Sequence, residues 1–234
     1  RETNPELTLA PGESLGYIES LLQMARAAAK NNLLFVLAAH SSPPDNGLWY
    51  SANMLESAVK ESWGKLADAL CDQWNVVGVD LHNEPHAATW GEGYVTRRWD
   101  LAAVRLGDHV LNLCPRWLVF VQGIASGAPG DGGDQAGYWW GENLVGATTF
   151  PILLSDQSKL VYAPHTFGPA KFQQPYFQDK GFPHNMPRVW DNHFLKTRST
   201  LSASMVIGAV GGQLNSHESI AWQHQALRYF GGLG

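Results

Sequence analysis

The segment VVGVDLHNEPH, residues 76–86, joins a largely apolar run to two histidines and a glutamate. A strand that is apolar along its length, rather than alternating, is typical of a parallel sheet covered by helices on its faces. Asn83, Glu84 and Pro85 follow where such a strand would end. The segment therefore predicts a buried parallel strand with polar side chains at its carboxyl end.

Similar apolar runs, bounded by turn residues, recur along the chain. They begin at residues 33, 76, 117, 159 and 204, which are 43, 41, 42 and 45 residues apart. Segments with apolar residues at helical spacing lie between or after them, at 14–32, 55–74, 100–114 and 217–230. This alternation predicts a string of βα units on a parallel sheet.

A string of βα units either closes into a (β/α)8 TIM barrel or stays open as a doubly wound sheet. Doubly wound sheets usually carry a nucleotide-binding glycine loop after the first strand. The first run here ends in AAHSSPP, and the glycine-rich segment 123–137 lacks both the phosphate-loop ending and the serine-hydrolase elbow. We therefore expect an α/β fold of the TIM-barrel type, with 123–137 as a flexible loop.

The number of strands is smaller than a closed barrel requires. About five βα units are visible where eight are needed. We expect a single domain over residues 1–234 that is incomplete at both ends. Open edges of a parallel sheet expose unpaired backbone, so other protein chains could complete or cover them.

Charge and hydropathy exclude some partners. A formal net charge of −5, from 16 basic and 21 acidic residues without basic runs, argues against nucleic acid and anionic membranes. The longest apolar run, residues 33–39, is far shorter than the roughly 20 residues of a membrane-spanning helix. We expect no membrane span and no cofactor.

The two histidines beside Glu84 raise the question of a metal site. Zinc peptidases use His-Glu-x-x-His on one helical turn. Here the glutamate stands one place too late, and Pro85 occupies a position where a helix needs a backbone N–H. We interpret Glu84 as a proton donor at a strand end, and His82 and His86 as residues in or behind a cleft, with no metal.

The two cysteines leave two interpretations open. Cys71 and Cys114 each stand a few residues before an apolar run. If the two strands are neighbours, the thiols lie at the same end of the sheet and could form a disulfide, which would fit an oxidising compartment. Two buried free thiols are the alternative.

Tryptophan is abundant, with 10 residues in the chain. Several fall in loop-like stretches, among them Trp49, Trp90 and Trp139. Exposed flat aromatic rings suit stacking on sugars. We expect these three to line a carbohydrate-binding cleft, although a single such tryptophan is more often a packing residue.

The segment VVGVDLHNEPH, residues 76–86, resembles the acid/base segment of glycoside hydrolase family 5, the cellulase-like endoglucanases. The likeness continues through residues 47–54, 138–147, 160–165 and 182–190, in the family's order and over nearly the whole chain. The resemblance implies a secreted protein that hydrolyses β-linked glucan with retention. It places the visible strands third to seventh in the barrel.

The resemblance also implies roles for individual residues. Glu84 would be the acid/base, and Asn83 would hold a sugar 2-hydroxyl. His40 and His165 would line the subsite at the point of cleavage. Among the residues that we expect at strand ends, Glu84 is the only carboxylate.

The chain departs from the family where the second carboxylate should stand. VIGAVGG, residues 206–212, carries Ala209 in place of the family's nucleophilic glutamate. Phe167 replaces the tyrosine whose hydroxyl holds that nucleophile. Without a carboxylate to orient, a buried hydroxyl loses its partner, so the two changes are consistent with each other.

Three hypotheses follow. The first is a family-5-like pseudoenzyme that keeps a carbohydrate-binding cleft for β-glucan or a related polysaccharide. The second is a retaining β-1,4-glucanase in an inactivated or partial form. The third is a structural or interaction domain of an extracellular assembly, without affinity for sugars.

Overall fold

The computed structural model describes residues 16–40 and 46–233. Its main sheet has five strands in the order β1-β2-β3-β4-β6, and a second sheet pairs β5 with β7. The strands are β1 (Phe35–Ala38), β2 (Val76–Asp80), β3 (Leu118–Val121), β4 (Leu160–Tyr162), β5 (His165–Phe167), β6 (Ser204–Met205) and β7 (Ala209–Gly211). All pairings are parallel.

Helices form close to the four predicted segments, and two shorter helices between residues 186 and 201 are additional to the predictions. The helices are α1 (Tyr17–Lys30), α2 (Glu56–Leu70), α3 (Trp99–Leu113), α4 (Met186–Trp190), α5 (Lys196–Leu201) and α6 (His217–Gly231). Short 3-10 helices are η2 (Val95–Arg97), η3 (Gly133–Ala136), η4 (Val145–Thr148), η5 (Gln157–Lys159) and η6 (Pro175–Gln178), and η7 (Asp191–Leu195) is a π-helix. No helix in the described ranges is long and apolar enough to cross a membrane.

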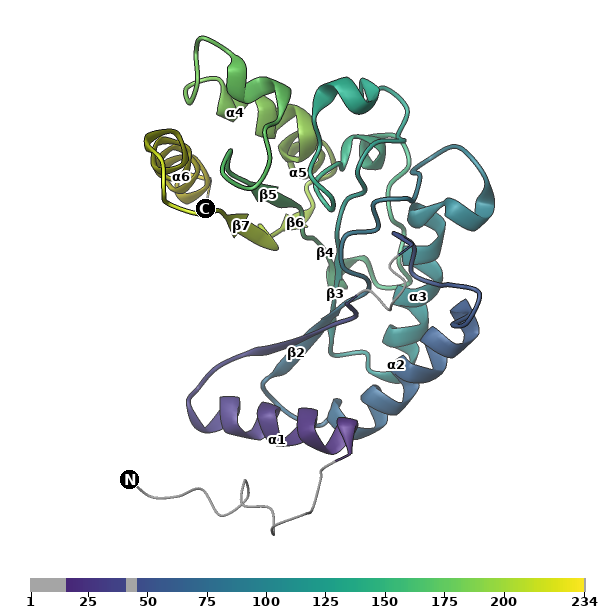
Figure 1. The fold of residues 1–234 in the computed structure, drawn as a ribbon. Coiled ribbons are helices and arrows are strands. Elements are labelled where there is room, and N and C mark those ends of the chain that lie inside the picture. Colours follow the sequence, from purple (N-terminus) through teal and green to yellow (C-terminus); the bar gives the residue numbers. More distant parts are fainter. Residues whose placement is uncertain (1–15, 41–45, 234) are drawn as a thin grey trace.

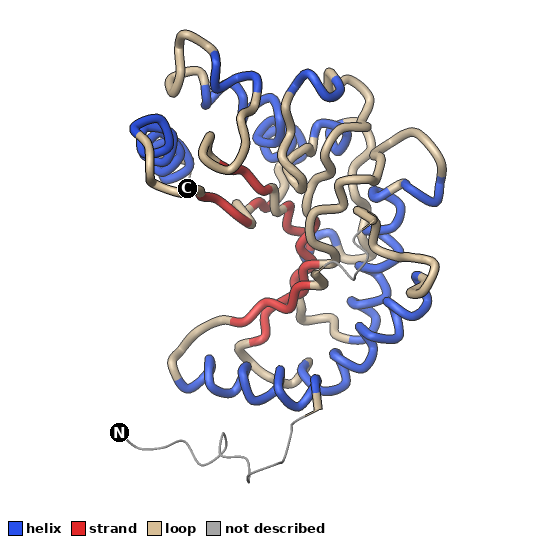
Figure 2. Tube along the Cα trace, in the orientation of Figure 1, coloured by secondary structure: helices blue, strands red, loops and turns tan. Residues whose placement is uncertain are grey.

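The strand order decides between the two α/β architectures. Neighbouring strands of the main sheet follow one another along the chain, without the reversal that marks a doubly wound sheet. In Figure 1 the sheet curves, and α1, α2 and α3 follow its outer side. The strands in Figure 2 form an arc with an open side. The TIM-barrel prediction is confirmed, and the described strands form part of such a barrel.

The last two predicted strands are each divided in two. The run from residue 159 gives β4 and β5, and the run from 204 gives β6 and β7. Pro164, which has no backbone N–H, interrupts the first run, and Gly208 lies opposite it. The Val206 N–H donates to the carbonyl of Tyr162, and the Gly208 N–H to that of Pro164. The two bent chains therefore stay paired through the break.

Both outer edges of the arc expose apolar side chains. Within the described residues β1 pairs only with β2, and β7 only with β5. Val36 in β1 and Val210 in β7 are each 41% exposed. These edges agree with the open strand edges expected from the sequence.

A disulfide joins the amino-terminal sides of two neighbouring βα units. Cys71 follows α2 and Cys114 follows α3, and their Cα atoms are 5.7 Å apart in the disulfide. The Arg116 guanidinium donates to the carbonyls of Cys71, Trp74 and Val76 across the same junction. The disulfide interpretation is confirmed, and the bridge lies at the end of the sheet opposite Glu84.

We predict that the disulfide is a major contributor to stability. It closes a loop with a sequence separation of 43 residues, for which the chain-entropy model gives about 4 kcal/mol. The double variant Cys71→Ser, Cys114→Ser should lose roughly that free energy of unfolding, measured by urea denaturation. Dithiothreitol should destabilise the parent and leave the double variant unchanged. Equal stability of parent and variant would contradict the prediction.

Candidate active site

Glu84 is held in an uncommon backbone conformation at the carboxyl end of the sheet. Its φ of +50° lies in the left-handed region, which non-glycine residues seldom adopt. Its N–H donates to Oε1 of Gln122 over 2.8 Å, and its own Oε1 lies 3.0 Å from Nδ1 of His165. The side chain is 19% exposed. Gln122, which follows β3, therefore fixes the backbone of Glu84, and His165 in β5 fixes its carboxyl group.

The Gln122 amide connects Glu84 to a second carboxyl group. Its Nε2 donates to Oδ2 of Asp80 over 2.6 Å, which leaves its Oε1 to accept from Glu84. Burial raises the pKa of Asp80 to about 6, opposed by the Gln122 hydrogen bond and the charge of His165. An ionised carboxylate only accepts hydrogen bonds, so it fixes which way the amide points.

Asp80 corrects the expectation that Glu84 is the only carboxylate at the strand ends. It is the last residue of β2. It stands inside an otherwise apolar run, so hydropathy alone does not mark it as a site residue. The presence of Gly78 two residues earlier, on the same face of the strand, is the signal that could have marked this face as different.

Gly141 lies directly against the site, at a position that no sequence pattern marks. Its φ is +81°, and an added Cβ would lie 3.0 Å from Oε1 of Gln122 and 3.3 Å from both Cγ of Glu84 and Cγ of His165. Its carbonyl accepts hydrogen bonds from Gly123 and His165. Only a glycine backbone lets this loop pass so close to the carboxyl group.

Two of the expected sugar-binding residues meet at the β1–β2 boundary. Nδ2 of Asn83 lies 3.4 Å from Nε2 of His40, and the Asn83 N–H donates to the carbonyl of Ala39.

Of the two histidines that flank Glu84, His82 packs edge-on to Trp99, with ring centroids 6.2 Å apart. In the described part of the chain no three His, Cys, Asp or Glu residues are grouped to hold a metal ion.

The strand pairing places Ala209 beside this constellation. In the β5–β7 ladder His165 pairs with Ala209, and Phe167 pairs with Gly211. Side chains of residues paired in register project to the same face of a sheet. Since His165 contacts Glu84, the Ala209 methyl group lies on the side of the ladder that faces the carboxyl group.

The expectation of exposed rings at Trp49, Trp90 and Trp139 is wrong, because these residues are only 3%, 0% and 6% exposed. The Trp90 indole donates to the carbonyl of Phe150, and the Trp49 indole donates to Glu56. Loops that fold back over the end of a barrel bury their large rings, and an indole N–H then finds a partner inside the protein. Trp49 and Trp90 are therefore packing residues.

Trp140, rather than its neighbour, presents an open ring. It is 51% exposed and stacks on His86, with centroids 3.6 Å apart and planes 11° from parallel. Nδ1 of His86 in turn lies 2.9 Å from the Glu84 carbonyl. The doubled tryptophan in the sequence thus has one buried and one exposed member.

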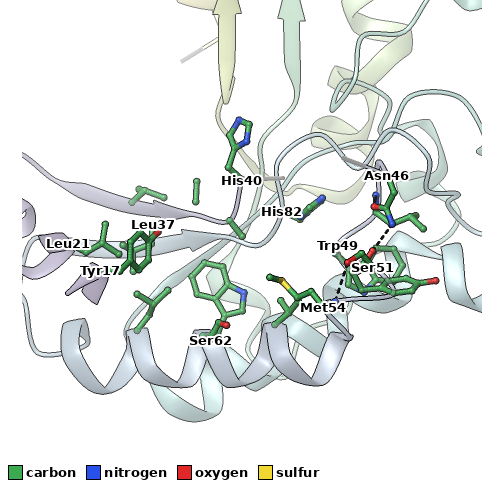
Figure 3. Close-up of a pocket in the computed structure, with 18 of the residues that line it drawn as sticks. Tyr17, Leu21, Leu37, His40, Asn46, Trp49, Ser51, Met54, Ser62 and His82 are labelled. Carbon is green, nitrogen blue, oxygen red and sulfur yellow. Dashed lines mark hydrogen bonds between the residues drawn. The ribbon is translucent and has the colours of Figure 1, made fainter. Parts of the chain in front are cut away.

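Some of the expected sugar-binding residues line two separate cavities, whereas Asn83, Trp90 and His165 line neither. One, of about 390 Å³, lies along β1 between α1 and α2, and His40, Trp49 and His82 lie around it (Figure 3). The other, of about 500 Å³, contains Glu84. It is lined by Glu84, Ala125, Ser126, Asp134, Gly137, Tyr138, Trp139, Trp140, Phe167, Lys171, Phe172 and Gln174. We refer to this second space as the Glu84 cavity.

Comparison with known proteins places this geometry in a family. The family model described as cellulase (glycosyl hydrolase family 5) matches residues 6–230. The chain belongs to glycosyl hydrolase family 5. An endoglucanase of Paenibacillus polymyxa is 34% identical over 97% of the chain and 57% of its own length. The major extracellular endoglucanase of Xanthomonas campestris is 33% identical over 86% of the chain and 42% of its own length.

Solved structures of the family have the same fold. A cellotetraose complex of a glutamate-to-alanine variant of the Pyrococcus horikoshii endocellulase matches with a TM-score of 0.86 and 32% identity, over 93% of this chain and 63% of that one. A cellotetraose complex of a tyrosine-to-phenylalanine variant of that enzyme matches with a TM-score of 0.85. The family-5 chain described here spans about half the length of the curated relatives it matches.

We predict that Gly141 tolerates no side chain. Gly141→Ala should lower the free energy of unfolding by about 2–4 kcal/mol, from backbone strain plus overpacking against Gln122 and Glu84. Gly130→Ala is the matched control, because Gly130 has a similar φ of +78° but an added Cβ there meets nothing within 4 Å. It should cost only about 1 kcal/mol. Equal costs in urea denaturation would contradict the close approach at Gly141.

We predict that Asp80 makes stability depend on pH. Its pKa is raised from 3.8 to about 6 by folding, so its contribution to the free energy of unfolding falls as pH rises through that window. Asp80→Asn removes this dependence. The stability of the variant relative to the parent should therefore increase by up to about 3 kcal/mol between pH 4 and pH 7. Any change in the free energy of unfolding caused by the new amide itself is independent of pH. A difference in stability between variant and parent that stays constant with pH would refute the raised pKa.

Proposed function

We propose that this family-5 domain binds β-glucan without hydrolysing it by the retaining route. The observation that carries the proposal is Ala209, paired with His165 beside Glu84. Retaining hydrolysis needs a second carboxyl group about 5–5.5 Å from the acid, to attack the anomeric carbon. A methyl group cannot form that bond. Glu84 remains as a proton donor without a nucleophile opposite it.

Two other carboxyl groups near Glu84 have different roles in this proposal. Asp80 accepts from Gln122 and thereby orients the amide that holds Glu84. Asp134 lines the Glu84 cavity and accepts a hydrogen bond from the Ser126 hydroxyl over 2.5 Å. It belongs to a glycine-rich loop rather than to the strand that bears the nucleophile in the resemblance. Asp134 is the residue to remove if any turnover is found.

The solved relatives support retention of binding after such changes. Cellotetraose complexes were obtained with a glutamate-to-alanine variant and with a tyrosine-to-phenylalanine variant of the Pyrococcus horikoshii endocellulase. Ala209 and Phe167 correspond to the same two kinds of replacement. By analogy, Asn83, His40 and His165 bind the sugar next to Glu84, and Trp139 contributes its accessible edge.

We also infer that the domain is extracellular. The Cys71–Cys114 disulfide fits an oxidising compartment. One relative is named as an extracellular endoglucanase. The exposed valines at the strand edges, Val36 and Val210, favour a second role as an interaction domain that packs against further protein. That role does not require sugar binding.

Binding and turnover of cellotetraose test the proposal together. We expect a saturable change in tryptophan fluorescence on titration, with no reducing sugar released above the rate without protein. Ala209→Glu restores the missing carboxylate and should give measurable hydrolysis if the rest of the site is intact. Added azide should form a glycosyl azide from an activated glycoside, by entering the space that the glutamate would fill.

Different outcomes separate the alternatives. Turnover by the parent at rates typical of the family would overturn the proposal, and its loss in Asp134→Asn would identify the substitute carboxylate. The absence of any fluorescence change or heat on titration would favour the interaction domain. Binding with no rescue by azide or Ala209→Glu would count against an otherwise intact glucanase.

A further inference from the structure

The Glu84 cavity contains a cation with no anionic partner. The Lys171 ammonium lies 3.5 Å from the centroid of the Phe167 ring, on the loop that follows β5. No carboxylate lies within ion-pair distance of it in residues 16–40 and 46–233. A ring face stabilises an ammonium but does not neutralise its charge.

The acidic groups of the cavity already have partners of their own. Glu84 contacts His165 and Asp134 accepts from Ser126. Neither carboxylate lies within ion-pair distance of Lys171. The charge on the lysine is therefore available to a ligand that enters the cavity.

The surroundings of Lys171 are aromatic. Phe167 and Phe172 both lie edge-on to Trp139, with ring centroids 5.5 and 6.5 Å away, and all three line the cavity. These rings line a space that stays open to solvent, because Phe172 is 64% exposed and Lys171 is also exposed. The rings offer apolar surface to the faces of a sugar ring.

We propose that the Glu84 cavity binds a β-linked oligosaccharide that carries a carboxylate, a uronate, and that Lys171 selects it over the neutral glucan. The proposal rests on the proposed function, because it requires a sugar-binding cavity. A uronate combines the two features of the site: its ring has apolar faces, and its C6 carboxylate projects from the ring edge as a single negative charge. A small free anion would use the ammonium but would gain nothing from the aromatic walls.

The experiment compares two tetrasaccharides with the same β-1,4 linkage, which carry either a hydroxymethyl group or a carboxylate at C6 of each ring. Cellotetraose and the tetrasaccharide of β-1,4-linked glucuronate are titrated into the whole chain by calorimetry, at low and at high ionic strength. We expect the uronate to bind about fivefold more tightly at low ionic strength, with the preference reduced by salt. Lys171→Gln should reduce the ratio of the two affinities to about one, and the ratio within each variant separates lost selectivity from weaker binding of both ligands.

Two control variants make the result specific. Lys171→Arg keeps the positive charge and should keep the preference. Lys180→Gln removes the charge of another exposed lysine that does not line the cavity, and should leave the preference intact. Thermal unfolding of each variant shows whether it is folded.

Each remaining outcome has one meaning. Equal binding of the two ligands by the parent would overturn the inference and leave the proposed function standing. A preference that survives Lys171→Gln would show that another group recognises the carboxylate and would overturn the assignment. If acetate competes for the Glu84 cavity as effectively as the uronate does, the cavity is a site for small free anions only. Failure of both ligands to bind would refute the proposed function itself.

Discussion

The side-chain amide of Gln122 is the constraint on which the candidate site depends. Parallel pairing of β2 and β3 places Phe120 opposite Asp80, so Gln122 lies two residues beyond the end of β2 and on the same face of the sheet. From there the amide donates to Asp80 and accepts from the Glu84 N–H. This pair of bonds offsets the cost of a left-handed backbone at Glu84. It places the carboxyl group within reach of His165 and explains why Gly141 must lack a side chain.

The same arrangement would keep the shape of the site in a domain that has lost its hydrolytic chemistry, as we propose for this one. The groups that hold Glu84 come from β2, β3, β5 and the loop at Gly141, and none of them depends on the side chain at position 209. Replacing a carboxylate on β7 by a methyl group therefore leaves the acid in place. Phe167 keeps an aromatic ring without a hydroxyl that would lack a partner, and that ring now supports the Lys171 ammonium.

Sequence patterns predicted those features that depend on the main-chain pairing. The apolar runs and the helical spacing between them predict the parallel sheet and its helices. Because parallel strands end at one edge, the same patterns also predict the grouping of four residues there: His40, Asn83, Glu84 and His165. The burial of Trp49 and Trp90 could not be predicted in this way, because it depends on how loops fold over the barrel end. The positions of Gly141 and Lys171 depend on loop paths as well. Asp80 is a single charged residue inside an otherwise apolar run, and the hydropathy pattern does not distinguish it from a core position.

We propose that no carboxylate among the described residues, 16–40 and 46–233, captures the anomeric carbon of a bound glucan. Intact-protein mass spectrometry after incubation with a fluorinated cellobiosyl donor tests this proposal. Such a donor traps the covalent intermediate of retaining enzymes. We expect an unchanged mass for the parent protein and an added cellobiosyl group for Ala209→Glu. A stable adduct on the parent protein, at Asp134 or at any other carboxylate, would contradict it.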